Sequence, residues 1–410
     1  MGSVTMKSKI ILALVFVLGL ISCRKDMPDM QNPRTETIYN WDQLFESYWN
    51  GMNYNYVFWD IDPTDWDKMY EVYKPKFEGI AKEGFDNKEV NDKAFEWLKE
   101  MSSTLIDNHF NLIATIPCDD TDCLYTYNPS FENLKKRKGY HDNYLNERIN
   151  ALQKIIADGR FVTGYFNIFP STSSLDARFF ISALTDSNIL YLSFSSFSIT
   201  ADLDSPENGE AMESILNIYY DNLDDNPDLK GVIIDVRGNS GGYLNDFKYV
   251  LGKFVNKPLK VFYTRKKSGI GRLDYTPYTP EYLEPYNYKR ELDIPVVILA
   301  DMHSLSMAEM TTMAVLALPK GNGVFIGEQT WGGTGNLNSD FDGTYGGQFE
   351  NNVLNVYTCM SSLVDSKGIS YEGKGIKPTI EVPLDVDKLL QEQIDNQLEY
   401  AIDYIESKQE

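Results

Sequence analysis

Residues 295–333 read PVVILADMHSLSMAEMTTMAVLALPKGNGVFIGEQTWGG, and the architecture of the chain can be worked out from this stretch. The apolar, β-branched run at 295–300 predicts a buried strand, and the small and apolar residues at about 307–318 predict a helix. A second apolar strand is expected at 324–327. A strand, a helix and a second strand in this order are typical of an α/β fold with a parallel sheet.

The turn before this helix contains the first candidate functional residue. It reads Ser304-Leu-Ser-Met-Ala-Glu309, so that Ser306 stands at the corner between strand and helix. A hydroxyl at such a corner lies clear of the sheet with helix N–H groups beneath it, which suits a catalytic nucleophile. The Ser306-x-x-Glu309 spacing is also typical of a capping box that only begins a helix. Both interpretations are open at this point.

Strands and helices alternate on the N-terminal side of this stretch as well. Apolar strands are expected at 190–194, 232–236 and 259–263, with helices at 211–223 and 244–255. A Tyr- and Pro-rich excursion at 276–288 then leads into the opening stretch. The pattern predicts an α/β domain with a buried, largely parallel sheet.

The N-terminal part has a different character. From Ile38 to about Leu105 large apolar residues recur at helical spacing, and five of the six tryptophans fall between Trp41 and Trp97. We interpret this aromatic stripe as the core of a small helical domain. Residues 116–185 are mixed, and no compact fold can be assigned to them.

The charge balance limits the kinds of partner. The 410 residues include 60 Asp and Glu against 38 Lys and Arg, which gives a net charge of −22. Binding to nucleic acid requires a basic face, and no basic stripe appears in the sequence. A nucleic-acid partner is therefore not expected.

The N-terminus has the features of a bacterial lipoprotein signal. Two lysines precede an apolar run at 10–21, which is too short to span a bilayer but suits the core of a signal peptide. Leu20-Ile-Ser-Cys23 resembles the lipobox, in which cleavage leaves the cysteine as the lipidated first residue. We therefore expect an extracytoplasmic protein that is anchored through a lipid on Cys23 at the bacterial cell envelope, either periplasmic or surface-exposed.

Three further cysteines follow Cys23. Cys118 and Cys123 bracket a four-residue acidic turn and could form a local disulfide or remain free thiols. Two cysteines without a matching histidine pair do not make a zinc site, so neither a metal nor an organic cofactor is expected. Cys359 falls in a strand-like run, and we interpret it as a buried structural thiol.

A second glycine-rich turn follows the strand predicted at 232–236. Gly231-Val-Ile-Ile-Asp235 runs into Val236-Arg-Gly-Asn-Ser-Gly-Gly242. Such a turn offers backbone N–H groups to an anion or to a developing oxyanion. Its spacing matches neither GxxxxGK[ST] nor GxGxxG, which excludes a phosphate-binding loop and leaves a plain tight turn as the alternative.

Four motifs in this order resemble those of the S41 peptidases, the family of the C-terminal processing proteases and the tricorn core protease. They are Asp235-Val-Arg-Gly-Asn-Ser-Gly-Gly242, Ser304-Leu-Ser-Met-Ala-Glu309, Gly327-Glu-Gln-Thr-Trp-Gly-Gly333 and Glu372-Gly-Lys-Gly-Ile-Lys-Pro378. Tyr56-Val-Phe-Trp-Asp60 and Asp65-Trp-Asp67 also resemble the helical domain that precedes tricorn-type members. The resemblance covers roughly 38–115 and 188–383, and it implies a ClpP/crotonase-like α/β core with serine peptidase activity.

Within this family, the resemblance favours the catalytic residues of the tricorn type. The processing proteases carry a lysine base in the glycine motif, at a place where this chain has Trp331. Tricorn-like members use a histidine that precedes the α/β domain and a glutamate from a late strand turn, which match His109 and Glu372. The serine of the family lies three residues before a glutamate, so the resemblance assigns the nucleophile to Ser306.

The resemblance also implies supporting roles. The N–H groups of Gly242 and Met307 would hold the oxyanion, with Gly241 beside them. Tricorn has a serine before the catalytic histidine that helps to hold the acid, and this chain has Asn108 there. His303 could act as a base, contact the oxyanion or line the edge of the site.

These observations divide the chain into six segments. They are a lipoprotein signal peptide (1–22), a tether (23–35), an N-terminal helical domain (36–115), a mixed connecting region (116–187), an S41 catalytic core (188–385) and a C-terminal helix (386–410). Many processing proteases carry a PDZ domain at the place of 116–187. No Gly-Leu-Gly-Phe-like loop is visible there, so we expect a PDZ domain to be absent or degenerate.

The expected function is that of a lipid-anchored serine endopeptidase that hydrolyses unfolded or extended polypeptides. The alternative is a catalytically inactive S41-like protein that binds a peptide, a glycan or an apolar ligand, which the 27 tyrosines and 21 phenylalanines would suit. An enoyl-CoA hydratase-like activity on a related fold does not agree with the secretion signal, because acyl-CoA substrates are cytoplasmic. The identity of the substrate and the oligomeric state are left open.

Overall fold

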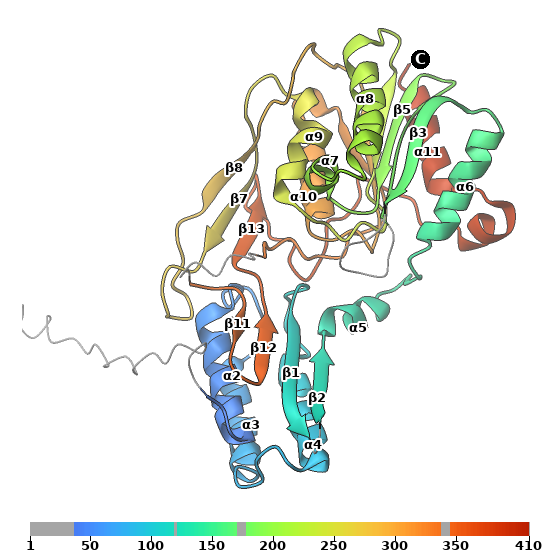
Figure 1. The fold of residues 1–410 in the computed structure, drawn as a ribbon. Coiled ribbons are helices and arrows are strands. Elements are labelled where there is room, and N and C mark those ends of the chain that lie inside the picture. The colour runs from blue at the N-terminus through green and yellow to red at the C-terminus, as the bar shows by residue number, and fades with distance from the viewer. Residues whose placement is uncertain (1–36, 119–120, 170–177, 338–344, 410) are drawn as a thin grey trace, which may run out of the picture.

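The computed structural model describes residues 37–118, 121–169, 178–337 and 345–409, which form two lobes (Figure 1). The expected signal peptide, the tether and Cys23 lie outside these residues. The N-terminal lobe contains helices α2 (Trp41–Asn55), α3 (Trp66–Glu78) and α4 (Lys88–Ser102). The core lobe contains the large sheet and most of the remaining helices. The predicted helical region ahead of a sheet-rich core is thus confirmed.

The helices of the N-terminal lobe begin at side-chain caps and pack through aromatic residues. Asn40, Asp65 and Asn87 each accept a backbone N–H from the first turn of the helix that follows. The ring of Phe45 on α2 stacks on that of Phe77 on α3, with 4.9 Å between their centroids. Trp41 is fully buried in the same cluster. The aromatic stripe in the sequence therefore forms a core.

The N-terminal lobe also contains a sheet that the sequence did not predict. Its strand order is β11-β12-β1-β2, with bounds β1 (Asn111–Cys118), β2 (Thr121–Tyr127), β11 (Phe349–Glu350) and β12 (Leu354–Tyr357). Strands β1 and β12 are antiparallel, and Asn111 lies opposite Tyr357. Half of this sheet thus comes from the C-terminal part of the chain, a pairing that no local sequence pattern can reveal.

The core lobe is built on a seven-stranded sheet of order β14-β10-β9-β6-β5-β4-β3. The bounds are β3 (Phe161–Phe169), β4 (Arg178–Thr185), β5 (Ile189–Phe194), β6 (Gly231–Asp235), β9 (Val296–Ala300), β10 (Gly323–Gly327) and β14 (Ile380–Glu381). From β5 to β14 neighbouring strands are parallel, and every residue of β5, β6 and β9 is buried. This confirms the predicted buried, largely parallel sheet.

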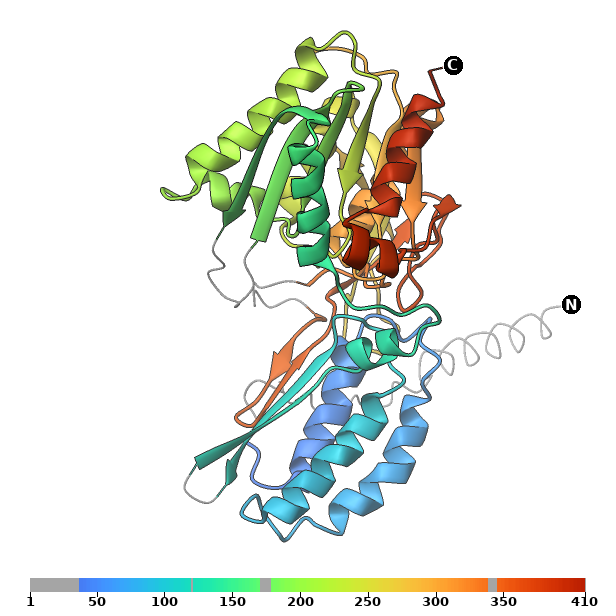
Figure 2. The same cartoon turned by 90° about the vertical axis from the view of Figure 1, so that its right-hand side faces the viewer.

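Helices cover both faces of this sheet (Figure 2). One face carries α7 (Ile199–Leu203), α8 (Gly209–Asp225), α9 (Phe247–Leu251) and α10 (Met307–Leu316), and the other carries α6 (Leu145–Ala157) and α11 (Asn396–Glu406). Short 3₁₀ turns lie at Leu244–Asp246, Gly252–Phe254 and Pro319–Gly321, and a π-helical turn at Lys388–Glu392 precedes α11. The buried face of α10 packs directly on β9 and β10, and this contact holds the N-terminus of α10 at the end of the sheet.

The structure shows the arrangement of two segments. The region 116–187, to which the sequence assigned no compact fold, contributes to both lobes: β2 joins the N-terminal sheet and β3 and β4 extend the large sheet, with α5 (Pro129–Lys135) and α6 between them. A strand does occur at 259–263, but it belongs to a small antiparallel sheet. That sheet has the order β13-β7-β8, with bounds β7 (Leu259–Lys266), β8 (Thr279–Leu283) and β13 (Ser361–Asp365).

Two further expectations concern the membrane and the cysteines. Within the part of the chain that the structure describes, no helix combines the length and the apolar composition that a membrane crossing requires. Cys123 is disulfide-bonded, whereas the side chain of Cys118 is outside the described atoms. Cys359 is a free, buried thiol, as the sequence suggested.

Candidate active site

Ser306 stands at the N-terminus of α10 in a strained backbone conformation. Its φ of 58° and ψ of −118° lie outside the regions that L-residues ordinarily adopt. Such strain persists only where the surrounding structure enforces it, and it clusters at functional sites. The side chain is half-buried at the corner between β9 and α10, where the sequence placed it.

Ser304, the other serine of the turn, is occupied by structural hydrogen bonds. Its fully buried Oγ donates to the carbonyl oxygen of Val236 at 2.7 Å and accepts the N–H of Asp301 at 2.9 Å. These bonds use the hydroxyl as both donor and acceptor. Ser304 is therefore a structural residue, in agreement with the assignment of the nucleophile to Ser306.

Glu309 ties the serine turn to the glycine motif. Its Oε2 accepts the N–H of Ser306 at 3.3 Å and that of Gly333 at 2.7 Å. Its Oε1 accepts the hydroxyl of Thr330 at 2.6 Å and the N–H of Gly332 at 2.8 Å. The predicted capping contact from Glu309 is thus present, but the same carboxyl group also fixes the loop that follows β10. The spacing in the sequence predicted only the capping role of Glu309.

Two backbone N–H groups beside Ser306 have no acceptor among the described residues. They belong to Met307, the first residue of α10, and to Gly242 in the second glycine-rich turn. Gly241 has a φ of +99°, and a side-chain carbon added to it would lie 2.7 Å from Cβ of Ser306 and 3.0 Å from N of Met307. The absence of a side chain at Gly241 is therefore what allows this turn to lie against the start of α10.

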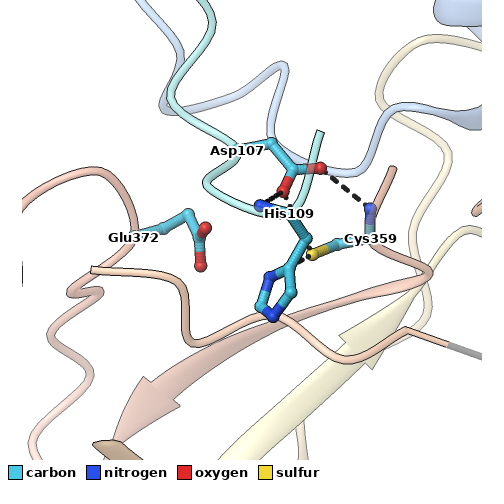
Figure 3. A group of neighbouring side chains, drawn as sticks. All are labelled: Asp107, His109, Cys359 and Glu372. Carbon is cyan, nitrogen blue, oxygen red and sulfur yellow. Dashed lines mark hydrogen bonds between the residues drawn. The ribbon is translucent and has the colours of Figure 1, made fainter. Parts of the chain in front are cut away.

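His109 comes from the N-terminal lobe and lies in a group of four side chains. Asp107, His109, Cys359 and Glu372 each contribute one nitrogen, oxygen or sulfur atom, and these atoms all lie within 4.8 Å of one another (Figure 3). His109 follows α4 and precedes β1, Cys359 follows β12, and Glu372 lies between β13 and β14. Three distant segments of the chain thus meet at one point.

The carboxylate of Asp107 lies beside His109 and accepts three hydrogen bonds. Its Oδ1 accepts the backbone N–H of His109 at 2.8 Å. Its Oδ2 accepts the hydroxyl of Thr358 at 2.7 Å and the N–H of Cys359 at 2.8 Å. These bonds join the segment before β1 to the segment after β12.

Cys359 bridges Asp107 and the imidazole. Its Sγ lies 3.3 Å from Oδ1 of Asp107 and 3.4 Å from Nδ1 of His109. A thiol that donates to the carboxylate can accept a hydrogen bond from Nδ1–H, which leaves Nε2 as the basic nitrogen. The sequence did not predict this contact, because Cys359 lies 250 residues from His109.

Glu372 is fixed by backbone and hydroxyl donors and makes no hydrogen bond to His109. Its Oε2 accepts the N–H groups of Thr334 and Gly335, each at 2.8 Å, and its Oε1 accepts the N–H of Asn108 at 3.3 Å. The side chain of Asn108 instead donates to the carbonyl oxygen of Gly332 at 2.8 Å. Asn108 thus contacts the acid through its backbone, where the resemblance suggested a side-chain contact.

Burial dominates the electrostatics of this group. It lowers the pKa of His109, an effect that the charge of Asp107 partly opposes. Burial, together with the charge of Asp107, raises the pKa of Glu372 well above its ordinary value. The same two causes raise the pKa of the Cys359 thiol, to which the charge of Glu372 adds. His109 is therefore kept neutral and Cys359 protonated near neutral pH.

Gly333 connects Ser306 and His109. Its carbonyl oxygen accepts the N–H of Ser306 at 3.0 Å, and a side-chain carbon built on it would lie 3.3 Å from Cε1 of His109. No hydrogen bond joins the Ser306 and His109 side chains in the described part of the chain. The structure thus brings both residues to Gly333 without a direct contact between them.

His303 and Trp331 line the edge of the site. His303 Nε2 hydrogen-bonds to the carbonyl oxygen of His141 at 2.9 Å, and its ring packs edge-on against Trp331. Trp331 Nε1 donates to Oγ of Ser130 at 2.8 Å. His303 is therefore engaged with the segment that leads into α6, and the edge-of-site interpretation agrees with this geometry.

The family comparison concerns the core lobe. Residues 188–382 match the model of Peptidase family S41. The match begins just before β5 and ends just after β14, so it includes Gly242, Ser306 and Glu372 and excludes His109. No curated protein matches the sequence.

Two solved structures show how far the fold is shared. The crystal structure of a candidate peptidase from Parabacteroides merdae is similar with a TM-score of 0.64 and 22% identity, over 90% of this chain and 97% of that chain. Mature CPAF complexed with lactacystin is similar with a TM-score of 0.55 and 12% identity, over 89% and 97% of the two chains. These likenesses extend over both lobes, so the helical lobe and the α/β core occur together in other proteins.

Proposed function

We propose, from the match of residues 188–382 to the model of peptidase family S41, that the chain is a serine endopeptidase with Ser306 as nucleophile, His109 as general base and Glu372 as an electrostatic partner. The family supports peptidase activity on a peptide or protein substrate. One observation carries the assignment of residues. The strained Ser306 lies at a helix N-terminus beside two N–H groups without acceptors, and the neutral His109 ring reaches the same Gly333.

In this proposal, Ser306 Oγ attacks the carbonyl carbon of the scissile peptide bond while its proton passes to Nε2 of His109. The N–H groups of Gly242 and Met307 donate to the oxyanion of the tetrahedral intermediate. His109 then gives its proton to the leaving amine, and water hydrolyses the acyl-enzyme by the same sequence of steps. Catalytic hydrogen bonds are often long in ligand-free enzymes, so we expect His109 to close on Ser306 when substrate binds.

The two acids have separate tasks in this scheme. The Asp107–Cys359 pair orients His109 through Nδ1, because the sulfur accepts that N–H. The imidazolium that forms during proton transfer lowers the raised pKa of the buried Glu372, and the ionised form of Glu372 in turn stabilises the imidazolium. The Cys359 thiol is therefore proposed to link Asp107, and not Glu372, to the imidazole.

The Ser306→Ala variant tests this function. Peptide hydrolysis should fall by about 10⁴-fold or more, because removal of a nucleophile leaves only the contribution of the oxyanion site and substrate binding. A fluorophosphonate probe should label the wild type and fail to label the variant. The Ser304→Ala variant is the control, since it should lose stability and still accept the probe at Ser306. An unlabelled wild type would favour the inactive binding protein.

We also propose that the protein is anchored at the bacterial cell envelope through a lipid on Cys23. The support is the signal-like run at 10–21 and the lipobox-like Leu20-Ile-Ser-Cys23. Full-length protein in a bacterial host should sediment with membranes, and a Cys23→Ala variant should not. Equal sedimentation of the two proteins would contradict the anchor.

A further inference from the structure

The group around His109 combines the donor atoms that transition-metal ions prefer. Asp107, His109, Cys359 and Glu372 supply two carboxylates, one imidazole and one thiol, and their side chains converge (Figure 3). Asp107, Cys359 and Glu372 are at most 1% exposed. Soft thiol and imidazole donors select zinc and related ions over magnesium and calcium, which prefer all-oxygen sites.

The spacing of the donors fits a tetrahedral ion. Zinc binds sulfur at about 2.3 Å and imidazole nitrogen at about 2.0–2.1 Å, so two ligand atoms on one tetrahedral ion lie about 3.5 Å apart. Cys359 Sγ lies 3.4 Å from Nδ1 of His109 and 3.3 Å from Oδ1 of Asp107. All four ligand atoms now lie within 4.8 Å of one another. A tetrahedral site that includes Glu372 forms if the most widely spaced of these atoms approach by roughly 1 Å.

The two buried carboxyl groups of this cluster have no cationic partner among the described residues. Asp107 and Glu372 are buried carboxyl groups, and no Lys, Arg or His in the described segments forms an ion pair with either of them. By contrast, the buried Asp301 pairs with Arg148, and the buried Asp235 and Asp395 pair with Arg237. Buried carboxylates are ordinarily paired or coordinate a metal, and among the described residues Asp107 and Glu372 accept hydrogen bonds only from neutral donors.

We propose that Asp107, His109, Cys359 and Glu372 form a binding site for a divalent transition-metal ion of the zinc type. Binding requires a thiolate, two ionised carboxylates and a free Nδ1. The Cys359 proton and the proton of a neutral Glu372 therefore leave to solvent as the metal bonds form, and the His109 ring carries its hydrogen on Nε2. The two carboxylates and the thiolate then share the charge of one divalent ion. This site was not predicted from the sequence, because its ligands lie in three separate segments that come together only in the fold.

The metal would switch the peptidase off, an extension that rests on the proposed function. An ion on Nδ1 leaves the remaining proton of the neutral imidazole on Nε2. That nitrogen can then no longer accept the proton of Ser306. A site that binds zinc therefore removes the base without touching the nucleophile, and a chelator restores it.

The binding experiment uses the full chain, freed of metal with a chelator. Zn²⁺ is titrated in competition with a chromophoric chelator, and we expect one equivalent to bind. Co²⁺ should give a thiolate-to-metal charge-transfer absorption, and Mg²⁺ and Ca²⁺ should not compete. The Ser306→Ala variant should bind equally well, so the measurement does not depend on peptidase activity.

Variants locate the site. Cys359→Ser and Cys359→Ala should each weaken Zn²⁺ binding by more than about 100-fold, the upper range for loss of a supporting residue alone, and abolish the Co²⁺ band. His141→Ala is the matched control, because His141 and Glu328 form a separate His–carboxylate pair at 2.8 Å and should leave binding unchanged. Circular dichroism checks that each variant is folded. Wild-type binding that both Cys359 variants retain, or no binding at all, would overturn the proposal.

The two proposals can fail separately. If zinc binding depends on Cys359 but a fluorophosphonate fails to label the metal-free wild type, the metal site is retained and the peptidase mechanism is overturned. Labelling of the wild type without any zinc binding would do the reverse. Zinc that binds at Cys359 and leaves labelling and hydrolysis unchanged would overturn the inhibitory role.

Discussion

Glu309 is the residue on which the geometry of the serine turn depends most directly. Its carboxyl group accepts hydrogen bonds from Ser306, Thr330, Gly332 and Gly333, and so joins the two loops that border the proposed catalytic site. The side chain is fully buried. Burial raises its pKa to about 7 despite these four donors.

The pKa of Glu309 predicts how stability should change with pH. The folded state binds the Glu309 proton more tightly than the unfolded state does. The contribution of this proton to the free energy of unfolding is therefore fully present below about pH 4.5 and is lost as pH rises through about 7. The stability of the wild type relative to Glu309→Gln should therefore fall by about 3 kcal/mol over this range, at about 1.4 kcal/mol per pH unit. Urea unfolding of both proteins at a series of pH values measures it. A difference that grows with pH would contradict the expectation.

At the scale of elements, the site depends on the close approach of a glycine-rich turn to the start of α10. Gly241 lies against Ser306, and the isolated bridge between Phe197 and Gly242 holds the turn from its other side. Phe197 N–H donates to the Gly241 carbonyl oxygen at 2.8 Å, and Tyr243 N–H donates to the Phe197 carbonyl oxygen at 2.9 Å. The N–H of Gly242 lies between these two bonds and has no acceptor among the described residues.

A Gly241→Ala substitution should therefore impair catalysis more than stability. The new methyl group would lie 2.7 Å from Ser306 Cβ, which forces the turn and the nucleophile apart. We expect kcat/KM to fall by about 10²–10³-fold, the loss that follows removal of one oxyanion donor. Steady-state hydrolysis of a peptide substrate provides the measurement.

Gly139→Ala is the control for the strain of the backbone alone. Gly139 also has a positive φ, +81°, but no atom lies within 4 Å of an added side-chain carbon. This variant should lose about 1–2 kcal/mol of stability and keep its activity. Equal kinetic effects at the two positions would show that the contact with Ser306 is unimportant.

At the scale of the molecule, the described chain passes between its lobes three times: into the core lobe after β2, back at β11 and β12, and into the core lobe again at β13. The group around His109 lies beside the last of these crossings, because Cys359 lies between β12 and β13. His109 lies within the N-terminal lobe, just before β1, whereas the segment 349–357 returns from the core lobe to pair with β1 before Cys359. Phe349 anchors this return, since its ring lies where a side chain on Gly51 of α2 would be, 2.2 Å from an added carbon. The returning segment is therefore held in the N-terminal lobe by side-chain packing as well as by strand pairing.

Replacement of Phe349 by Ala should loosen the packing of the segment 349–357 against α2. Loss of this buried ring should lower the free energy of unfolding by about 3–5 kcal/mol. Activity should fall further than the unfolded fraction explains, because the segment after β12 also holds Asp107, which orients His109. Chemical unfolding and hydrolysis rates test this together. Tyr357→Ala, on the same segment at a side chain that is 37% exposed, should cost less than about 1 kcal/mol. Similar effects of the two variants would contradict the anchoring role.

The sequence by itself determined the elements and the motifs of the core. The apolar periodicities of β5, β6, β9 and β10 and of α8 and α10 are local properties of contiguous residues, and each was predicted within a few positions. Ser306 could be placed at a helix start because its turn follows a buried strand directly. The motif order was sufficient to indicate the S41 family, which the match over 188–382 bears out.

Tertiary structure decided which residues lie together. Three sets of contacts join groups that are distant in sequence. They are the pairing of β1 with β12, the contact of Cys359 with Asp107 and His109, and the hydrogen bonds of Glu309 with Gly332 and Gly333. No periodicity encodes such contacts, because they depend on the packing of whole lobes and not on the conformation of any one segment. For this reason the sequence could name His109 by its motif, while only the fold shows the buried thiol and carboxylate on which its ring rests.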